Sequence, residues 1–122
     1  MRRSLSLLLL LCLLLGGCAA GTHREEADNT LYFFHNNPCE SCHEDRVFSD
    51  LVHTLLPDAS PAIRPYYIYD SSARAVLQEL LDRYAIEGDL TYPLAVYRGH
   101  FLFGYDAISR QLPDLWKEGS NR

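Results

Sequence analysis

Two cysteines separated by two residues, Cys39 and Cys42, are the residues of this 122-residue chain best suited to do chemistry. A pair at this spacing can close into a disulfide, open to a dithiol and exchange two electrons with another disulfide. A ring of so few residues removes little entropy from the unfolded chain, so this disulfide would be a poor structural staple. We therefore expect both cysteines to be catalytic, with Cys39 as the exposed attacking sulfur and Cys42 resolving the mixed disulfide.

The histidine that follows the pair opens two other interpretations. Cys39, Cys42 and His43 form C-x-x-C-H, the attachment motif of c-type haem, in which both sulfurs form thioethers and the histidine is an axial ligand. The second axial ligand would be one of the remaining histidines of the folded region, His35, His53 or His100. A zinc site from the same three residues and a distant histidine is the other interpretation, but its second half has no recognisable spacing. Several strand-like aromatic segments argue against a small helical cytochrome, so we favour thiol exchange and predict no cofactor and no metal.

The N-terminus has the pattern of an export signal. Arg2 and Arg3 precede an apolar run, Leu5–Leu15, which as a helix would rise only about 16 Å and would not span a membrane core of roughly 30 Å. The four residues Leu15-Gly16-Gly17-Cys18 resemble the bacterial lipobox. This resemblance implies a signal peptide over residues 1–17, cleavage before Cys18, and attachment of lipid to the Cys18 sulfur. We expect an extracytoplasmic protein anchored to a bacterial membrane by lipid.

Composition and charge limit the organisation of the rest of the chain. With 48% hydrophobic and 22% charged residues, the chain has the composition of one folded domain. The formal net charge is −5, and loss of two arginines with the signal makes it more negative still, which disfavours nucleic acid as a partner. Residues 19–30 lack an apolar period and are expected to be a tether. We assign residues 18–30 to the lipidated cysteine and tether, and residues 31–122 to the folded domain.

Apolar periodicity predicts the order β-α-β-α-β-β-α after the tether. Strands are expected at residues 31–34, 66–69, 94–98 and 101–103, with a loop at 58–65 and Gly99-His100 as the spacer of a hairpin. The helices are expected to begin at Glu40, Asp70 and Asp106, with Pro57 ending the first, Gly88 and Asp89 closing the second, and Pro113 starting or kinking the third. The sequence thus predicts an α/β fold with a central mixed four-stranded sheet and three helices.

The first of these helices would place the cysteine pair at a helix N-terminus. Unpaired backbone N–H groups and the helix dipole favour a thiolate at such a position. The second cysteine, one turn further along, would then attack the first in a fast intramolecular step. This placement strengthens the prediction of thiol exchange.

Several short motifs together resemble the thioredoxin family. They are Phe33-Phe34, Pro38, the Cys39-Glu40-Ser41-Cys42 motif, and Tyr92-Pro93 before a later strand. The resemblance spans residues 31–116 and implies a minimal thioredoxin-like fold without the family's additional N-terminal strand and helix. It also implies that Pro93 is cis and faces the cysteine pair, and that Tyr92 and Pro93 form the substrate-binding site, with the Tyr92 backbone pairing with an extended substrate segment.

The chain departs from the thioredoxin pattern in ways that bear on its chemistry. Glu-Ser replaces Gly-Pro between the cysteines, Pro38 stands where the family has tryptophan, and the first predicted strand has no acidic residue to shuttle protons. Glu40 beside Cys39 opposes thiolate formation, which makes the disulfide less oxidising. The resemblance therefore implies an oxidoreductase that reduces or isomerises disulfides of exported proteins and is served by a membrane or periplasmic redox partner. A thioredoxin-fold lipoprotein that binds without turnover is the alternative.

Overall fold

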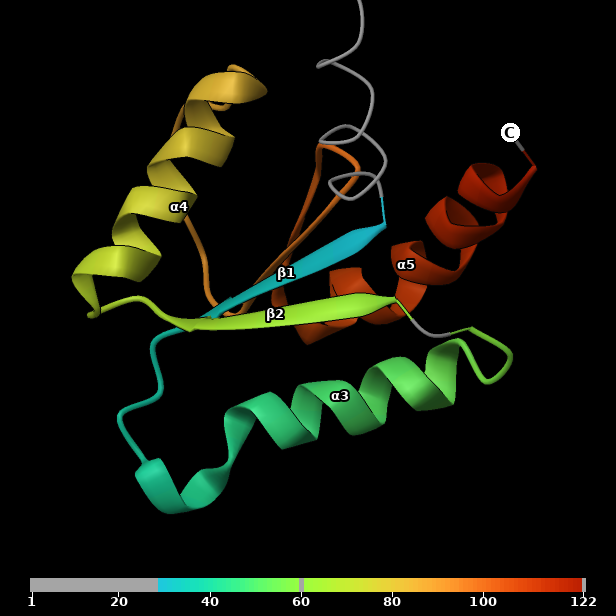
Figure 1. Ribbon diagram of the computed structural model, residues 1–122, viewed down its shortest axis with the longest axis horizontal. Helices are drawn as coiled ribbons and strands as arrows, with labels where there is room; N and C mark the ends of the chain where they lie inside the picture. Colours follow the sequence, from blue (N-terminus) through green and yellow to red (C-terminus); the bar gives the residue numbers. More distant parts are fainter. Residues whose placement is uncertain (1–28, 60, 122) are drawn as a thin grey trace, which may run out of the picture.

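The computed structural model of the protein describes residues 29–59 and 61–121, whose arrangement is drawn in Figure 1. In this part of the chain a four-stranded mixed sheet, in the order β2-β1-β3-β4, is flanked by three α-helices. The elements are β1 (Thr30–His35), a 3-10 turn (Glu40–Cys42), α3 (Glu44–Leu55), β2 (Ala62–Tyr67), α4 (Ser71–Arg83), β3 (Leu94–Tyr97), β4 (His100–Phe103) and α5 (Gly104–Ser120). The predicted element order is confirmed, and the architecture is that of a minimal thioredoxin-like α/β fold. The predicted signal peptide and lipidation site lie outside the described residues.

Strand pairing brings four chain segments to the same end of the sheet. β1 runs parallel to β2, with His35 opposite Tyr67, and antiparallel to β3, with Phe34 opposite Leu94. β4 returns antiparallel to β3, so Phe103 also lies opposite Leu94. The same end of the sheet therefore holds the loop to the cysteines, the end of β2, the start of β3 and the start of α5.

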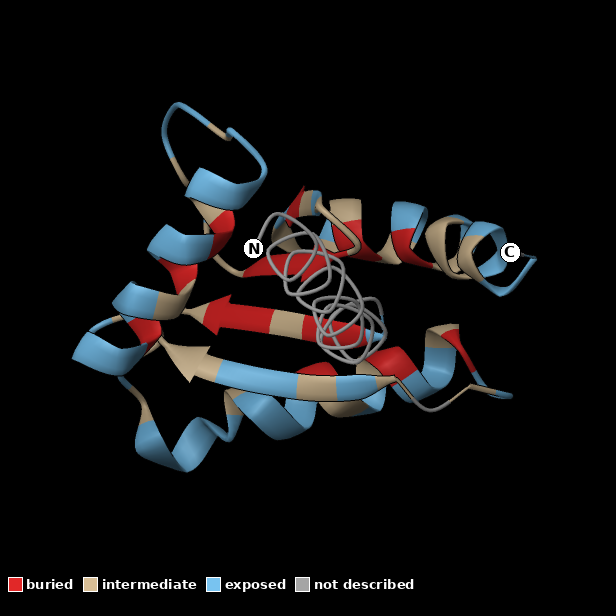
Figure 2. Cartoon of the chain, turned by 45° about the horizontal axis from the view of Figure 1, so that its top comes forward, coloured by how far each residue is buried: buried red, intermediate tan, exposed pale blue. Residues whose placement is uncertain are grey.

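Alternation along β1 divides the core between the two faces of the sheet. Leu31 and Phe33 point into a cluster that α3 and α5 cover, whereas Phe34 points into a cluster that α4 covers. Figure 2 shows the inner stripes of the helices as buried and their outer surfaces as exposed. On the first face, Phe33 stacks on Phe48 of α3 with ring centroids 3.9 Å apart. This stack fixes α3, and with it the segment that precedes α3, against the sheet.

The loop predicted at residues 58–65 is wrong in its second half, because β2 begins at Ala62. Pro65 suggested a loop, yet it pairs with Phe33 inside the parallel ladder. β2 is an edge strand, so the missing N–H of a proline removes no hydrogen bond that a further strand would need.

The hairpin and the helix that precedes it also differ in detail from the prediction. The turn residues are Arg98 and Gly99, both at positive φ (50° and 79°), so His100 belongs to β4 rather than to the spacer. α4 ends at Arg83, several residues before Gly88. Its end is set by Ala85, which adopts a left-handed conformation (φ 51°) while the Ile86 amide donates to the Leu81 carbonyl at 2.9 Å.

The last helix starts earlier than expected and accommodates its proline. α5 begins at Gly104 rather than Asp106 and continues past Pro113 to Ser120. Ile108 and Leu112 are fully buried in it, as the apolar spacing predicts. The early start places Tyr105 in the first turn of α5, close to the end of the sheet where the cysteine loop lies.

Candidate redox site

Cys39 and Cys42 form a disulfide with their Cα atoms 5.3 Å apart. Cys39 directly precedes a 3-10 turn that Cys42 ends, and the Cys42 amide donates to the Cys39 carbonyl at 3.1 Å. Cys39 is partly buried and Cys42 is exposed, which reverses the order of exposure expected from the sequence. The Ser41 hydroxyl lies 3.5 Å from the Cys39 sulfur, and because a disulfide sulfur has no hydrogen, the hydroxyl is the donor.

The sequence predicts that the first α-helix begins at the cysteine pair. In the structure it begins only at Glu44. His43 separates the two by adopting a left-handed conformation (φ 47°), one that histidine enters more readily than most side chains. Its carbonyl accepts hydrogen bonds from the amides of Arg46 (2.9 Å) and Val47 (3.0 Å), so His43 caps α3. The dipole of α3 therefore begins beyond the disulfide, where Glu44 and Asp45 in its first turn complement the dipole instead of a thiolate.

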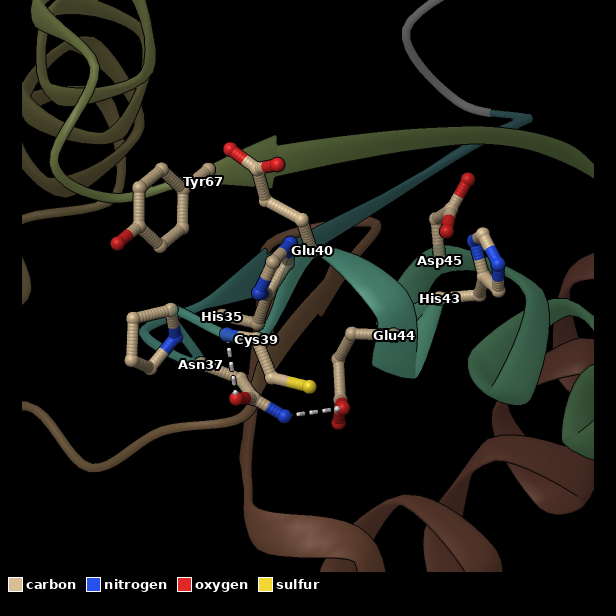
Figure 3. Close-up of a pocket in the computed structure, with 9 residues that line it drawn as sticks. His35, Asn37, Cys39, Glu40, His43, Glu44, Asp45 and Tyr67 are labelled. Carbon is tan, nitrogen blue, oxygen red and sulfur yellow. Dashed lines mark hydrogen bonds between the residues drawn. The ribbon is translucent and has the colours of Figure 1, made fainter.

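A chain of hydrogen bonds connects the start of α5 to the backbone of Cys39. The Cys39 amide donates to Asn37 Oδ1 (3.1 Å), and Asn37 Nδ2 donates to Glu44 Oε2 (3.0 Å), as the dashed lines of Figure 3 show. The other carboxylate oxygen of Glu44 accepts a hydrogen bond from the Tyr105 hydroxyl. Burial, and then the bond to Glu44, raise the pKa of Tyr105 far above its ordinary value, so it remains a donor at neutral pH. The start of α5, the start of α3 and the loop before Cys39 are thus joined next to the disulfide.

Beside this chain lies a hollow of about 310 Å³ that opens next to Cys39. Carboxylates of Glu40, Glu44 and Asp45 line it, together with His35 and Tyr67 from the ends of β1 and β2. The His35 ring packs against Tyr67, with centroids 5.5 Å apart, and its buried Nδ1 has no hydrogen-bond partner among the described residues. In Figure 3 the sulfur of Cys39 and the carboxylate of Glu44 extend into the same space. The hollow is therefore an acidic, partly aromatic cavity with Cys39 of the disulfide at its edge.

The Tyr92-Pro93 peptide bond is cis, as the thioredoxin resemblance implies. Pro93 immediately precedes β3, and its carbonyl accepts a hydrogen bond from the Gly104 amide at 2.7 Å. This places the cis peptide bond at the same end of the sheet as the cysteine loop. Burial, and secondarily the charge of Tyr69, raise the pKa of the neighbouring Tyr92.

The histidines required by the haem and zinc interpretations are distributed over the whole domain. His53 is exposed in the last turn of α3, and His100 is exposed at the start of β4, beside the hairpin turn at the opposite end of the sheet. His35 alone among these three lines the same hollow as His43. No group of three or more histidine, cysteine, aspartate or glutamate side chains within residues 29–59 and 61–121 has the arrangement of a metal site.

The three residues of the hydrogen-bond chain, Asn37, Glu44 and Tyr105, were not recognised in the sequence. The sequence alone assigns no role to any of the three. Sixty-one positions separate Glu44 from Tyr105, so only the fold brings them together. A glutamate two residues after a C-x-x-C was the one local signal available.

We found no match to the chain among protein-family models, curated proteins or solved structures. None of the helices described between residues 29 and 121 is long and apolar enough to cross a membrane.

Proposed function

We propose that the protein is a thiol-disulfide oxidoreductase whose active centre is the Cys39–Cys42 pair. The observation that carries the proposal is a disulfide on a short turn at the mouth of an open hollow, in a minimal thioredoxin-like α/β domain. Such a ring contributes little to stability, so its value to the protein lies in opening and closing. Both cysteines are accessible enough for another sulfur to approach.

In the reducing direction, the Cys39 thiolate attacks one sulfur of a client disulfide, and the other client sulfur leaves as a thiolate and takes a proton. Cys42, after losing its proton, attacks the Cys39 sulfur and releases the second client thiol. The client gains two electrons and the chain is left with the disulfide seen in the structure. An external dithiol must then reduce that disulfide, and we propose that this is a membrane or periplasmic redox partner.

Three carboxylates that line the same hollow as Cys39 support a reductant or isomerase in preference to a strong oxidant. Glu40 follows Cys39 directly, and Glu44 and Asp45 line the same hollow. Negative charge near a cysteine disfavours its thiolate, and a less stable thiolate makes the disulfide harder to reduce. We expect a reduction potential closer to the value of about −270 mV for thioredoxin than to the value of about −120 mV for strong periplasmic oxidants.

Tyr92 and Pro93 are proposed to bind the client. They lie at the same end of the sheet as the cysteine loop, and Phe103, which is 38% exposed, lies opposite Leu94 next to them. An extended client segment that pairs with the backbone at this end of the sheet would bring its disulfide toward Cys39. Thr30, the first residue of β1, lies at the opposite end of the strand from the cysteine loop.

The assay is reduction of a peptide disulfide by a small dithiol in the presence of the full-length protein. We expect the wild-type protein to accelerate the reaction and Cys39→Ser and Cys42→Ser to lose the acceleration. Equal acceleration by all three proteins would overturn the proposal. Protein produced in a host that matures c-type cytochromes is expected to show no Soret absorption, and such absorption would favour the haem alternative.

The lipid anchor is a separate part of the proposal and has its own test. The lipobox-like residues imply that Cys18 carries the lipid, and two or three acyl chains would hold the protein firmly at a membrane. We expect labelled palmitate to enter the wild-type protein and not Cys18→Ala. Equal labelling of the two proteins would refute the anchor without bearing on the chemistry at Cys39.

A further inference from the structure

We infer that Glu44 is a positioning residue for the proposed redox centre: held by Tyr105, it orients Asn37, which fixes the backbone of Cys39 and so sets the stability of the Cys39–Cys42 disulfide. The inference rests on the proposed function and names the groups that determine the equilibrium between the Cys39–Cys42 disulfide and the dithiol. It applies to residues that the sequence motifs do not include.

Both backbone groups of Cys39 are engaged in hydrogen bonds. Its carbonyl accepts from the Cys42 amide at 3.1 Å, and its amide donates to Asn37 Oδ1 at 3.1 Å. The first bond belongs to the turn itself, but the second depends on how the Asn37 amide is oriented. An asparagine amide is free to flip unless its nitrogen is also bound.

Glu44 supplies that second bond and is itself held on both sides. Its Oε2 accepts from Asn37 Nδ2 at 3.0 Å, while its Oε1 accepts from the Tyr105 hydroxyl. Tyr105 follows β4 directly in α5, whose residues Ile108 and Leu112 are fully buried in the core. Cys39 is therefore linked to the core of the domain through Asn37, Glu44 and Tyr105. Figure 3 shows the first two of these side chains meeting below the Cys39 sulfur.

This arrangement has a consequence for the dithiol form. Two thiols form a disulfide readily when they are held close together, because the pair then has a high effective concentration. If Asn37 no longer held the Cys39 amide, the loop before Cys39 would gain freedom and the two sulfurs would meet less often. The disulfide would become less stable relative to the dithiol, and the protein would become a stronger oxidant.

The test is the equilibrium constant for forming the disulfide from the dithiol and oxidised glutathione, measured on the full-length protein at neutral pH. Asn37→Ala removes the hydrogen bonds to the Cys39 amide and to Glu44, Tyr105→Phe removes the hydrogen bond to Glu44, and both leave every charge in place. We expect each to lower the constant about three- to tenfold, the range that the net contribution of one hydrogen bond allows. Because the two residues act through Glu44, the double variant should lower it by no more than twofold beyond the larger single effect.

Two matched controls separate positioning from general effects. Asn36→Ala removes the exposed neighbouring asparagine, and Tyr84→Phe removes the hydroxyl of a tyrosine beside the hairpin turn. Both should leave the constant within twofold of wild type. Thermal unfolding of every variant verifies that it is folded at the temperature of the measurement.

Single variants that match the controls would overturn the inference, as would a double variant whose effect is the product of the two single effects. The measurement follows the protein's own disulfide and needs no client turnover. A wild-type protein that equilibrates with glutathione but accelerates no exchange would therefore contradict the proposed function while the positioning role of Glu44 could still be measured.

Discussion

On one face of the sheet, α3 and α5 pack together against β1, β3 and β4, whereas on the other face α4 packs alone. The disulfide and the hydrogen-bond chain beside it are attached to the two-helix face, whereas Tyr92 of the proposed client site packs against the α4 cluster. The disulfide precedes α3, Glu44 lies in the first turn of α3, and Tyr105 lies in the first turn of α5. Packing on this face should therefore govern both stability and redox chemistry, while packing on the α4 face should govern stability with little effect on the disulfide.

The largest effect is expected from Phe48→Ala on the two-helix face. Phe48 is fully buried and stacks on Phe33, and truncation of such a residue costs about 3–5 kcal/mol. For a small domain this is a large share of a total stability of about 5–15 kcal/mol. We expect a marked fall in the urea midpoint and, under conditions where the variant is still folded, a change of the glutathione equilibrium, because α3 carries Glu44.

Leu77→Ala on the α4 face is the matching change. Leu77 is 5% exposed, and its truncation should cost about 2–5 kcal/mol in urea unfolding. The glutathione equilibrium of the folded variant should remain within twofold of the wild-type value. A shift as large as that caused by Phe48→Ala would show that both faces of the sheet support the disulfide.

A smaller effect is expected at the hairpin turn, at the opposite end of the sheet from the disulfide. Gly99 has a φ of +79°, and a Cβ added there would lie 2.6 Å from the Tyr84 ring. We expect Gly99→Ala to cost about 1–3 kcal/mol in unfolding free energy and to leave the disulfide equilibrium unchanged. Gly88→Ala is the control, because Gly88 also has a positive φ but its Cβ would meet open space. Equal costs would mean that the contact with Tyr84 contributes nothing.

The smallest effect is a pH dependence of the bond between α3 and α5. The pKa of Tyr105 is raised from its ordinary value of 10.0, by burial and by the hydrogen bond to Glu44. The folded state therefore holds this proton more tightly than the unfolded state, and the resulting stability is present below pH 10 and lost as the pH rises above it. At neutral pH, Tyr105→Phe should cost about 1 kcal/mol of unfolding free energy. The difference from wild type should shrink above pH 10, and a constant difference would contradict the assignment.

The element order and the core positions could be predicted because they follow from local periodicity. Ile108 and Leu112, for example, are buried as their spacing indicates. The boundaries failed where tertiary context overrides a local signal. Pro65 is tolerated because β2 is an edge strand, and His43 bends the chain so that the helix starts after the cysteine pair. The order of exposure of the two cysteines failed for the same reason.

The site was half predictable. A C-x-x-C and a Tyr-Pro before a strand are local motifs, and the structure brings both to one end of the sheet. The bond from Tyr105 to Glu44 joins residues from separate helices, and no local pattern encodes such a contact. Residues proposed to perform chemistry in this fold are therefore easier to recognise in a sequence than residues proposed to hold them in place.

The most direct test of the central claim is to mix Cys42→Ser with a peptide that contains a disulfide and to determine by mass spectrometry which sulfur carries the peptide. We expect a stable mixed disulfide on Cys39, because the resolving sulfur is gone, and no comparable adduct on Cys42 in the Cys39→Ser variant. Adducts confined to Cys42 would contradict the assignment of the attacking sulfur, and the absence of any adduct on either variant would contradict thiol exchange itself.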